Sequence, residues 1–195
     1  MNFLAHLYLA GESNDLKIGG AIADWVKGKN IYTFSPEIQK GIILHRDIDE
    51  FTDKHEIFIY CKSYFKSKYD KYSGVVIDIV FDHFLSYNWS NFSKCDKDIY
   101  ISDFYELLRP HIKNLPEQAQ FYFPRMIQNN WLKMYESIDG LEKVLIGMGN
   151  RTSMPKEAEF AINQIQLNYD DINSNFLEFF KEIKIYIGEK YCIEY

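Results

Sequence analysis

Apolar residues recur at intervals of three and four along nearly every long segment of this chain, and this is the period of an amphipathic helix. Within residues 35–53, for example, Ile38 and Ile42 would share one face of a helix. Residues 74–89 are rich in Val and Ile, but their length and polar spacing favour a helix over a strand. No alternating run bounded by hairpin turns is present. The pattern therefore predicts an all-α fold.

Turn and cap signals divide the chain into helices. Ser35-Pro36 is a strong start signal, because a serine N-cap precedes a proline in the first helical turn. A length of 195 residues suits a single domain. We therefore expect a single-domain helical bundle over residues 1–195. Its expected helices cover 14–28, 35–53, 54–69, 74–89, 101–108, a segment from Pro116 interrupted by Pro124, 131–149 in one or two pieces, and a final helix from Lys156 with a break near Asn173.

The charge and the cysteine content limit the class of protein. A formal net charge of −6 argues against general nucleic-acid binding, which needs a basic surface. Cys61, Cys95 and Cys192 are odd in number and far apart, as expected in a reducing compartment. The N-terminal segment lacks the basic region of a signal peptide, and no apolar run is long enough to span a bilayer. We expect a cytoplasmic protein that binds neither nucleic acid nor membrane.

Polar residues interrupt the helix faces that are expected to pack in the core. His45, Asp49 and Asp53 lie at i, i+4 and i+8, so they stack on one face of the helix over 35–53. The same face begins with apolar residues. Unpaired charge is costly in such a position, so this stripe needs an explanation.

Two other expected helices show the same feature. Asp24 lies where an apolar residue would be expected in the first of them. Asp78 and Asp82 are four residues apart in the helix over 74–89, and His83 follows directly. Three helices therefore deliver acids from segments rich in core residues, and two of the three also deliver a histidine.

Each of these residues has a structural explanation and a functional one. A histidine on an apolar face is commonly a hydrogen-bonded core residue, Asp78 suits a helix N-terminus, and Asp53 suits a helix end. A buried carboxylate, however, needs a cation or hydrogen bonds, and basic residues are scarce nearby. A divalent metal would supply that charge, and mixed histidine and carboxylate ligands suit Mn²⁺, Fe²⁺ or Mg²⁺. Such ions favour hydrolysis, above all of phosphoesters. The pattern alone leaves a metal site and a hydrogen-bonded polar core both open.

Five blocks of the sequence together resemble one protein family. They are MNFLAHLYLA at the start, AIADWVKG (21–28), LHRDIDEFTD (44–53), DIVFDHFLSYNW (78–89) and LIGMGNRTSMP (145–155). In this order they are similar to the acyl carrier protein phosphodiesterases. The resemblance implies a Mn²⁺-dependent enzyme that hydrolyses the phosphodiester between 4′-phosphopantetheine and a serine of holo acyl carrier protein. It also implies an all-helical fold distantly related to the HD phosphohydrolases.

The HD signature is absent in its usual form. That signature has a His followed directly by Asp, whereas the adjacent pair here is Asp82-His83, in reversed order. Positions are therefore carried over from the five blocks rather than from the HD pattern. On this basis Asp24, His45 and Asp82 are the expected metal ligands, because they come from different helices that can converge.

The remaining roles are assigned from side-chain chemistry within the resemblance. Asp49 is either a ligand or the base that orients the attacking water, and His83 either orients a ligand or protonates the leaving serine oxygen. Arg46 is a candidate phosphate contact, because its guanidinium fork suits phosphate oxygens. The second group of candidates is His6, Asp53, Asp78 and Asn2, the last of which is alternatively a helix cap.

A basic segment over residues 54–71 has two interpretations. It holds five lysines against two acidic residues, and the simplest explanation is a solvated helix face. Acyl carrier proteins are acidic, so Lys62, Lys66 and Lys68 can alternatively dock the carrier protein through salt-sensitive contacts.

Two other functions fit the same residues. One is a metal-dependent hydrolase of the same fold that acts on a nucleotide or another small phosphoester. The other is a helical module that binds a carrier protein without catalysis. Metal content separates the module from the enzymes, and salt-sensitive binding of holo carrier protein separates the two enzymes.

Overall fold

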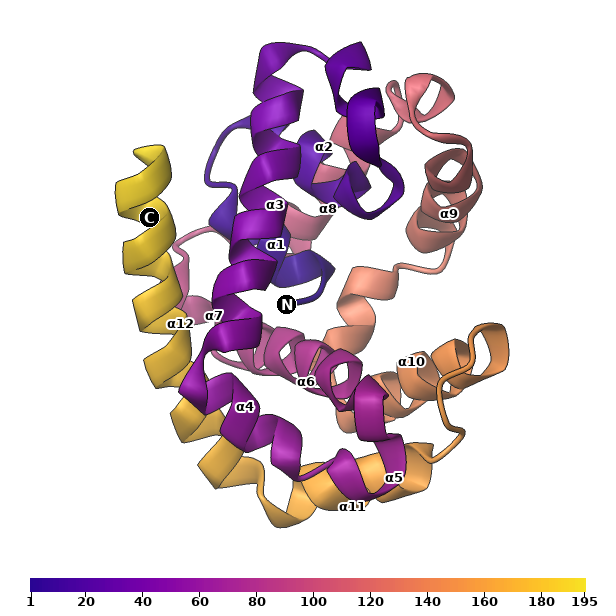
Figure 1. Cartoon of the computed structure of the whole chain (residues 1–195), viewed down its shortest axis with the longest axis vertical. Coiled ribbons are helices and arrows are strands. Elements are labelled where there is room, and N and C mark those ends of the chain that lie inside the picture. The colour runs from indigo at the N-terminus through magenta and orange to yellow at the C-terminus, as the bar shows by residue number, and fades with distance from the viewer.

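The computed structural model describes residues 1–195 as an all-helical protein without strands, which confirms the predicted fold class (Figure 1). The α-helices are α1 (Phe3–Leu9), α2 (Asn14–Ile22), α3 (Pro36–Lys54), α4 (Glu56–Ser63), α5 (Lys66–Tyr69), α6 (Ser73–Tyr87), α7 (Trp89–Phe92), α8 (Lys97–Leu108), α9 (Glu117–Gln128), α10 (Ile138–Arg151), α11 (Ala158–Leu167) and α12 (Tyr169–Tyr191). Short 3-10 helices are η1 (Ala23–Trp25), η2 (Gly28–Thr33), η3 (Asp70–Tyr72), η4 (Ile112–Asn114) and η5 (Trp131–Glu136).

The cap signals of α3 act as the sequence predicts. Ser35 Oγ accepts a hydrogen bond from Ile38 N at 3.4 Å, and Pro36 occupies the first helical position. The Val- and Ile-rich segment is also confirmed as a helix, because α6 spans Ser73–Tyr87. These two helices carry most of the residues predicted for the site.

Several helix boundaries differ from the prediction. The helix expected over 101–108 begins at Lys97, because Asp96 caps it by accepting hydrogen bonds from Asp98 N and Ile99 N. The helix expected over 14–28 corresponds to α2, which ends at Ile22 and is followed by η1. Residues 54–69 form two helices, because the chain turns at Phe65, which is fully buried. Pro124 lies inside α9, where buried neighbours on both sides hold the helix in place. The break in the C-terminal segment falls at Asn168 rather than Asn173.

A close contact between backbones joins α2 to α3. A Cβ atom on Gly19 would lie 2.3 Å from Ile38 O, and one on Gly41 would lie 2.6 Å from Leu16 O. Only glycine therefore fits at both positions, and the two helices approach more closely than helices with larger side chains at the crossing. This contact fixes η1, which follows α2, beside the middle of α3.

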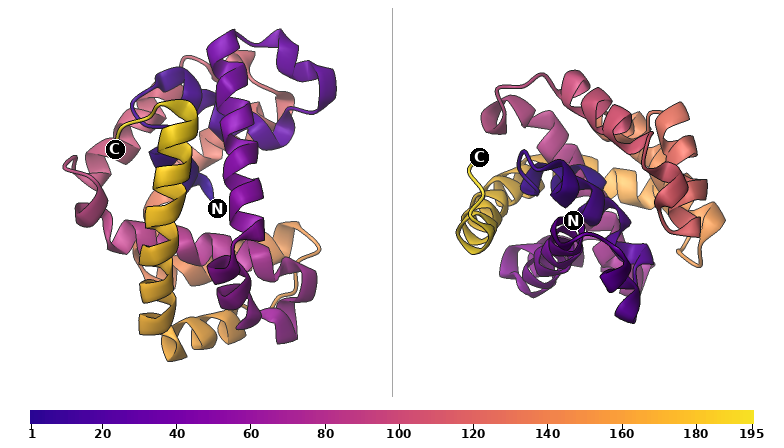
Figure 2. Two further views of the ribbon diagram at one scale, coloured as in Figure 1. Left: turned by 60° about the vertical axis from the view of Figure 1, so that its left-hand side comes forward. Right: turned by 90° about the horizontal axis from the view of Figure 1, so that it is seen from above.

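The helices are arranged around α6, most of whose residues are buried. Figure 2 shows α12 lying along α3, while α1 packs against α6 and α2 packs against α3 and α1. The apolar side chains form one continuous cluster of 52 buried residues. None of the helices combines the length and the apolar character needed to cross a bilayer.

Candidate metal centre

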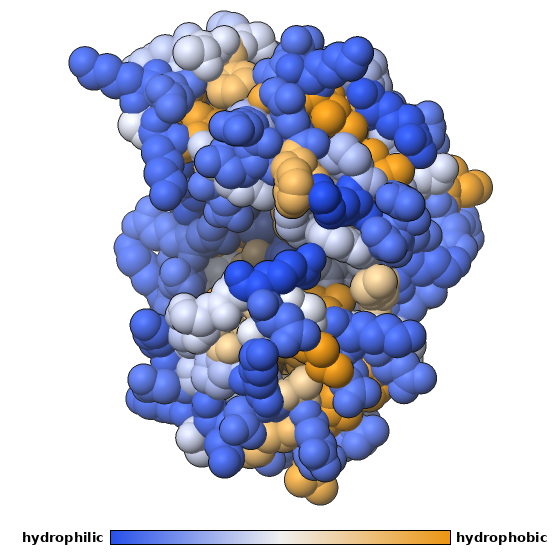
Figure 3. All heavy atoms as spheres, turned by 90° about the vertical axis from the view of Figure 1, so that its right-hand side faces the viewer, coloured by the Kyte–Doolittle hydropathy of each residue, from blue (hydrophilic) through white to orange (hydrophobic).

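A large cavity opens on the side of the molecule where α9 and α10 lie. Figure 3 faces this side and shows a hollow with strongly hydrophilic side chains at its rim. The cavity has a volume of about 1160 Å³, and 14 of its 28 lining residues are hydrophobic. It is therefore large enough for an extended organic ligand, with polar groups at defined positions.

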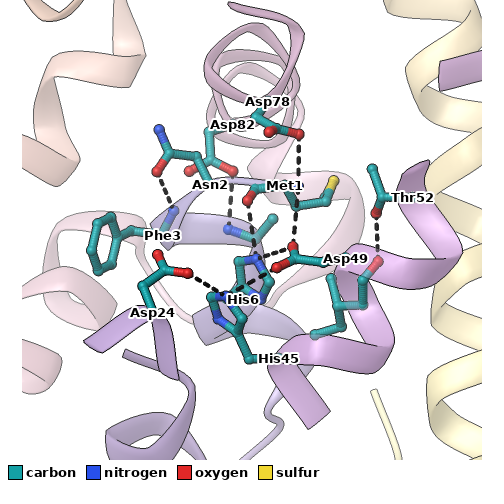
Figure 4. Close-up of polar contacts among 12 residues, drawn as sticks. Met1, Asn2, Phe3, His6, Asp24, His45, Asp49, Thr52, Asp78 and Asp82 are labelled. Carbon is teal, nitrogen blue, oxygen red and sulfur yellow. Dashed lines mark hydrogen bonds and ion pairs between the residues drawn. The ribbon is translucent and has the colours of Figure 1, made fainter. Parts of the chain in front are cut away.

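Two histidines and two carboxylates from three different elements meet in this cavity (Figure 4). His6 comes from α1, Asp24 from η1, and His45 and Asp49 from α3. Asp49 contacts the edges of both rings: Oδ1 is 3.2 Å from His6 Nε2, and Oδ2 is 3.1 Å from His45 Nε2. Asp24 Oδ1 lies 3.4 Å from the same nitrogen of His45. The structure thus brings together Asp24, His45 and Asp49, which the sequence predicts for the site.

The two imidazole rings stack face to face. Their centroids are 3.8 Å apart and their planes differ by 14°. His6 and His45 are 5% and 9% exposed, so both rings are enclosed by their surroundings. Such stacking brings both Nε2 atoms to one side, where they face Asp49.

The side chains of the cluster shift one another's pKa values. Burial and the neighbouring His45 lower the pKa of His6 to about 4. Burial also opposes charge on His45, but its hydrogen bonds to Asp24 and Asp49 outweigh this and raise the pKa of His45 to about 9. Although burial alone would raise it, hydrogen bonds from both histidines hold the pKa of Asp49 well below its usual range. Asp49 is therefore ionised at neutral pH.

The donor set fits a divalent cation. One ligand atom each from His6, His45 and Asp49 lie within 4.8 Å of one another. A cation with bonds of about 2.1 Å joins atoms that are at most about 4 Å apart, so at most a small inward shift lets these three groups share one ion. The buried Nδ1 atoms of both histidines have no hydrogen-bond partner, so hydrogen bonding alone leaves each ring half satisfied.

Asp82, which the sequence predicts as a metal ligand, is bound by backbone N–H groups. It is fully buried beneath α1, and its two oxygens accept hydrogen bonds from Leu4 N at 2.8 Å and Ala5 N at 3.2 Å. It does not line the cavity. Burial raises the pKa of Asp82 to about 7, although the two backbone N–H groups act in the opposite direction. This carboxyl therefore holds the N-terminus of α1, and with it His6, against α6.

His83 and Arg46 also lie outside the cavity lining. Both ring nitrogens of His83 are engaged, Nδ1 with Tyr135 O at 2.7 Å and Nε2 with Tyr169 Oη at 2.9 Å. Arg46 is exposed and donates to Val26 O at 2.8 Å. The structure does not bring either side chain to the His/Asp cluster.

The second group of candidates gathers around the cluster. Asn2, Asp53 and Asp78 line the cavity together with His6. Asn2 Oδ1 also accepts a hydrogen bond from Phe3 N at 2.9 Å, so it caps α1 as well as facing the site. Asp78 Oδ1 lies 2.7 Å from the backbone nitrogen of Met1, which is itself 3.8 Å from Asp49 Oδ1.

The opposite wall of the cavity was missed by the sequence prediction. It is formed by α9, η5 and α10, and its polar members include Arg125, Lys143 and Arg151. Two of these residues lie outside the five blocks, and no role was assigned to any residue of block 145–155. No pattern of spacing links α9 and α10 to the His/Asp cluster, because the contact depends on tertiary folding.

The expected lysine surface is separate from the cavity. Lys66 and Lys68 on α5 are exposed, and Lys62 on α4 is half-buried with its Nζ 5.9 Å from the Phe58 ring centre. None of the three lysines lines the cavity.

An all-helical protein with clustered histidines and carboxylates in a large cavity falls in the class of candidate metal-dependent hydrolases. Comparison with known proteins identifies the family within this class. A family model described as acyl carrier protein phosphodiesterase matches residues 1–183. The chain belongs to the acyl carrier protein phosphodiesterase family, which confirms the resemblance seen in the five sequence blocks.

Individual relatives match over nearly their whole length. The acyl carrier protein phosphodiesterase of Yersinia enterocolitica is 33% identical over 186 residues, covering 92% of this chain and 94% of the relative. The protein of the same name from Yersinia pestis is 31% identical, with the same coverage of 92% and 94%. The one from Escherichia coli O139:H28 is 29% identical, covering 97% of this chain and 99% of the relative. No solved structure matches the chain.

Proposed function

We propose that this protein hydrolyses the phosphodiester that joins 4′-phosphopantetheine to a serine of holo acyl carrier protein. The products are apo carrier protein and free 4′-phosphopantetheine. The family match over residues 1–183 carries this proposal. The convergence of His6, Asp24, His45 and Asp49 in one cavity supports it.

The proposed metal ligands are His6, His45 and Asp49, with Asp24 completing the set. This set differs from the one expected from sequence, because His6 enters it and Asp82 caps α1 instead. Two imidazoles with two carboxylates suit Mn²⁺, with Mg²⁺ or Fe²⁺ as alternatives. Such a cation supplies positive charge to phosphoryl oxygens and acidifies water.

The side chains around these ligands have separate tasks. Asp49 is ionised, and its two oxygens lie within hydrogen-bonding distance of both imidazole rings; a bound cation would replace these hydrogen bonds with metal–ligand bonds from the same three side chains. Asp24 is the most accessible of the four, with 71% of its side chain exposed, and hydrogen bonding from His45 lowers its pKa. It is therefore an ionised carboxylate that can accept a hydrogen bond from the attacking water. His83 holds Tyr135, and so η5, in place through its bond to Tyr135 O.

We propose that residues 1–195 form one catalytic domain and that the enzyme is cytoplasmic. The continuous apolar core supports a single domain, and the three free thiols suit a reducing compartment. We propose Lys62, Lys66 and Lys68 as contacts for the acidic carrier protein, since none of them forms an ion pair within the chain. Arg46, which lies on the outer surface, is a further proposed contact for the carrier protein.

The test is the intact mass of holo acyl carrier protein after incubation with this protein, with Mn²⁺ or with a chelator. We expect metal-dependent loss of the phosphopantetheine arm. His45→Ala should abolish both this loss and the binding of Mn²⁺ measured by calorimetry. His111→Ala is the matched control, because His111 lies outside the cavity.

Three outcomes separate the alternatives. An unchanged carrier mass, with folded protein that binds Mn²⁺, would exclude the carrier protein as substrate and favour a small phosphoester. Failure to bind any divalent cation would instead favour the non-catalytic module. Loss of the arm that is insensitive to the chelator would refute the metal assignment.

A further inference from the structure

The cavity wall opposite the His/Asp cluster carries cations that have no acidic partner. Arg125 of α9, and Lys143 and Arg151 of α10, line the cavity. The ion pairs of the protein involve other lysines and arginines, such as Arg109 with Glu106. In a chain with a net charge of −6, this wall is an uncompensated positive region that faces a negative one.

Arg151 is held in a defined position at the end of α10. Its Nε donates to Gly147 O at 3.0 Å, so the side chain folds back along its own helix. A Cβ atom on Gly147 would lie 3.3 Å from the nearest guanidinium nitrogen. Glycine at this position therefore leaves the space that the guanidinium occupies. Because Lys143, Gly147 and Arg151 are spaced at i, i+4 and i+8, they share one face of α10.

A chain of aromatic rings connects Arg151 with the His/Asp cluster. The guanidinium carbon lies 5.1 Å from the centre of the Trp131 ring. Trp131 contacts Tyr122 with ring centres 4.9 Å apart, and Tyr122 contacts Trp25, which follows Asp24, at 5.3 Å. Burial raises the pKa of Tyr122 to about 12, with Arg151 acting to lower it and Asp24 to raise it. Tyr122 thus lies between Trp131, which contacts Arg151, and Trp25, which follows Asp24.

Arg125 is less suited to reach the cluster. Its guanidinium lies 3.4 Å from the centre of the Phe121 ring and donates to Phe121 O at 2.8 Å. Phe121 is 66% exposed, so this pair lies at the rim of the cavity. Arg151 is exposed as well, but it contacts Trp131, from which aromatic contacts continue to Trp25 beside Asp24, whereas Arg125 contacts only Phe121 at the rim.

We propose that Arg151 binds the non-bridging oxygens of the substrate phosphodiester while the His/Asp cluster holds the other side of the phosphate. This inference rests on the proposed function and adds a specific phosphate-binding residue to it. The guanidinium fork matches two phosphate oxygens, and no carboxylate of the protein competes for it. The guanidinium would add its charge to that of the cation held by the cluster, whose carboxylates alone would repel a phosphodiester.

The test measures binding of 4′-phosphopantetheine, the product that keeps the phosphate, to the full-length protein loaded with Mn²⁺. Calorimetry should show about 10- to 100-fold weaker binding to Arg151→Ala, the range expected for hydrogen bonds to a charged group. Arg151→Lys keeps the charge without the fork, so we expect an intermediate affinity. Arg109→Ala is the matched control, because this arginine is exposed, paired with Glu106 and distant from the cavity lining.

Two results would overturn the proposal. One is equal affinity of the wild-type protein and Arg151→Ala for 4′-phosphopantetheine. The other is a raised KM for holo carrier protein with unchanged binding of 4′-phosphopantetheine, which would make Arg151 a contact for the carrier protein instead. Circular dichroism establishes that each variant is folded.

Failure of the proposed function is distinguishable from failure of this inference. If the wild-type protein leaves holo carrier protein intact, the same calorimetry is carried out with inorganic phosphate. Weaker phosphate binding to Arg151→Ala than to Arg109→Ala then supports the phosphate site by itself. Equal binding to the two variants overturns it.

Discussion

Gly19→Ala is expected to destabilise the protein through the contact between α2 and α3. The added Cβ would lie 2.3 Å from Ile38 O and 2.8 Å from the Cα atom of Gly41. Ordinary contacts of this kind begin at 3.4 Å, so the two helices would have to separate by about 1 Å. Both contacts involve backbone atoms, and no side-chain rotation can relieve them.

The magnitude follows from two opposing effects. Overpacking in a close-packed interior costs about 1–3 kcal/mol, and replacing a helical glycine with alanine returns at most about 1 kcal/mol. Because both clashes involve backbone atoms, we expect a cost of about 3 kcal/mol. Subtracting the gain of about 1 kcal/mol leaves a loss of about 2 kcal/mol in the free energy of unfolding. The same separation moves Asp24 away from His45, which should weaken Mn²⁺ binding about 10- to 100-fold.

The neighbouring glycine provides the control. A Cβ atom on Gly20 would meet only Gly41 O, at 4.0 Å, so Gly20→Ala should be tolerated. Urea unfolding followed by circular dichroism measures stability, and calorimetry measures the affinity for Mn²⁺. Equal stability of the two variants would refute the account of the α2–α3 contact. Lower stability of Gly19→Ala with unchanged Mn²⁺ affinity would refute its link to the metal centre.

Two further predictions concern buried groups. Asp82→Asn should lower the free energy of unfolding by about 1–3 kcal/mol, because an amide has one acceptor oxygen where Leu4 N and Ala5 N both donate; a urea titration that matches the wild-type protein would contradict this capping role. Burial raises the pKa of Cys61 to about 12, so iodoacetamide at mildly alkaline pH should modify only the two exposed thiols of the folded protein. Mass spectrometry counts the modified thiols, and rapid modification of all three without denaturant would show that the burial of Cys61 is wrong.

The helices could be predicted from the sequence because their signals are local. Ser35-Pro36 fixes the start of α3, and a period of three and four residues identifies α6 as a helix despite its Val and Ile content. Boundaries such as Asn168 could not be predicted in the same way. They depend on which side chains the rest of the protein buries, and adjacent residues do not reveal this.

The candidate site was only partly predictable for the same reason. Spacing within α3 places His45 and Asp49 on one face, and the structure brings both together with Asp24. Whether a carboxylate binds a cation or caps a helix depends on what packs against it. For Asp82 the partner is the N-terminus of α1, which lies more than seventy residues earlier in the chain. Arg151 has no signal in its own helix, since its relevance depends on a wall formed by distant residues.

The positions of the tryptophans give the protein an optical reporter of its own. Trp25 and Trp131 both line the cavity, and they account for two of the three tryptophans in the chain. The third, Trp89, is 5% exposed elsewhere, where its indole N–H donates to Cys95 O. Indole emission responds to local polarity and nearby charge, so filling the cavity alters the signal of Trp25 and Trp131 against a constant background from Trp89. Occupancy of the cavity can therefore be followed in the unlabelled protein.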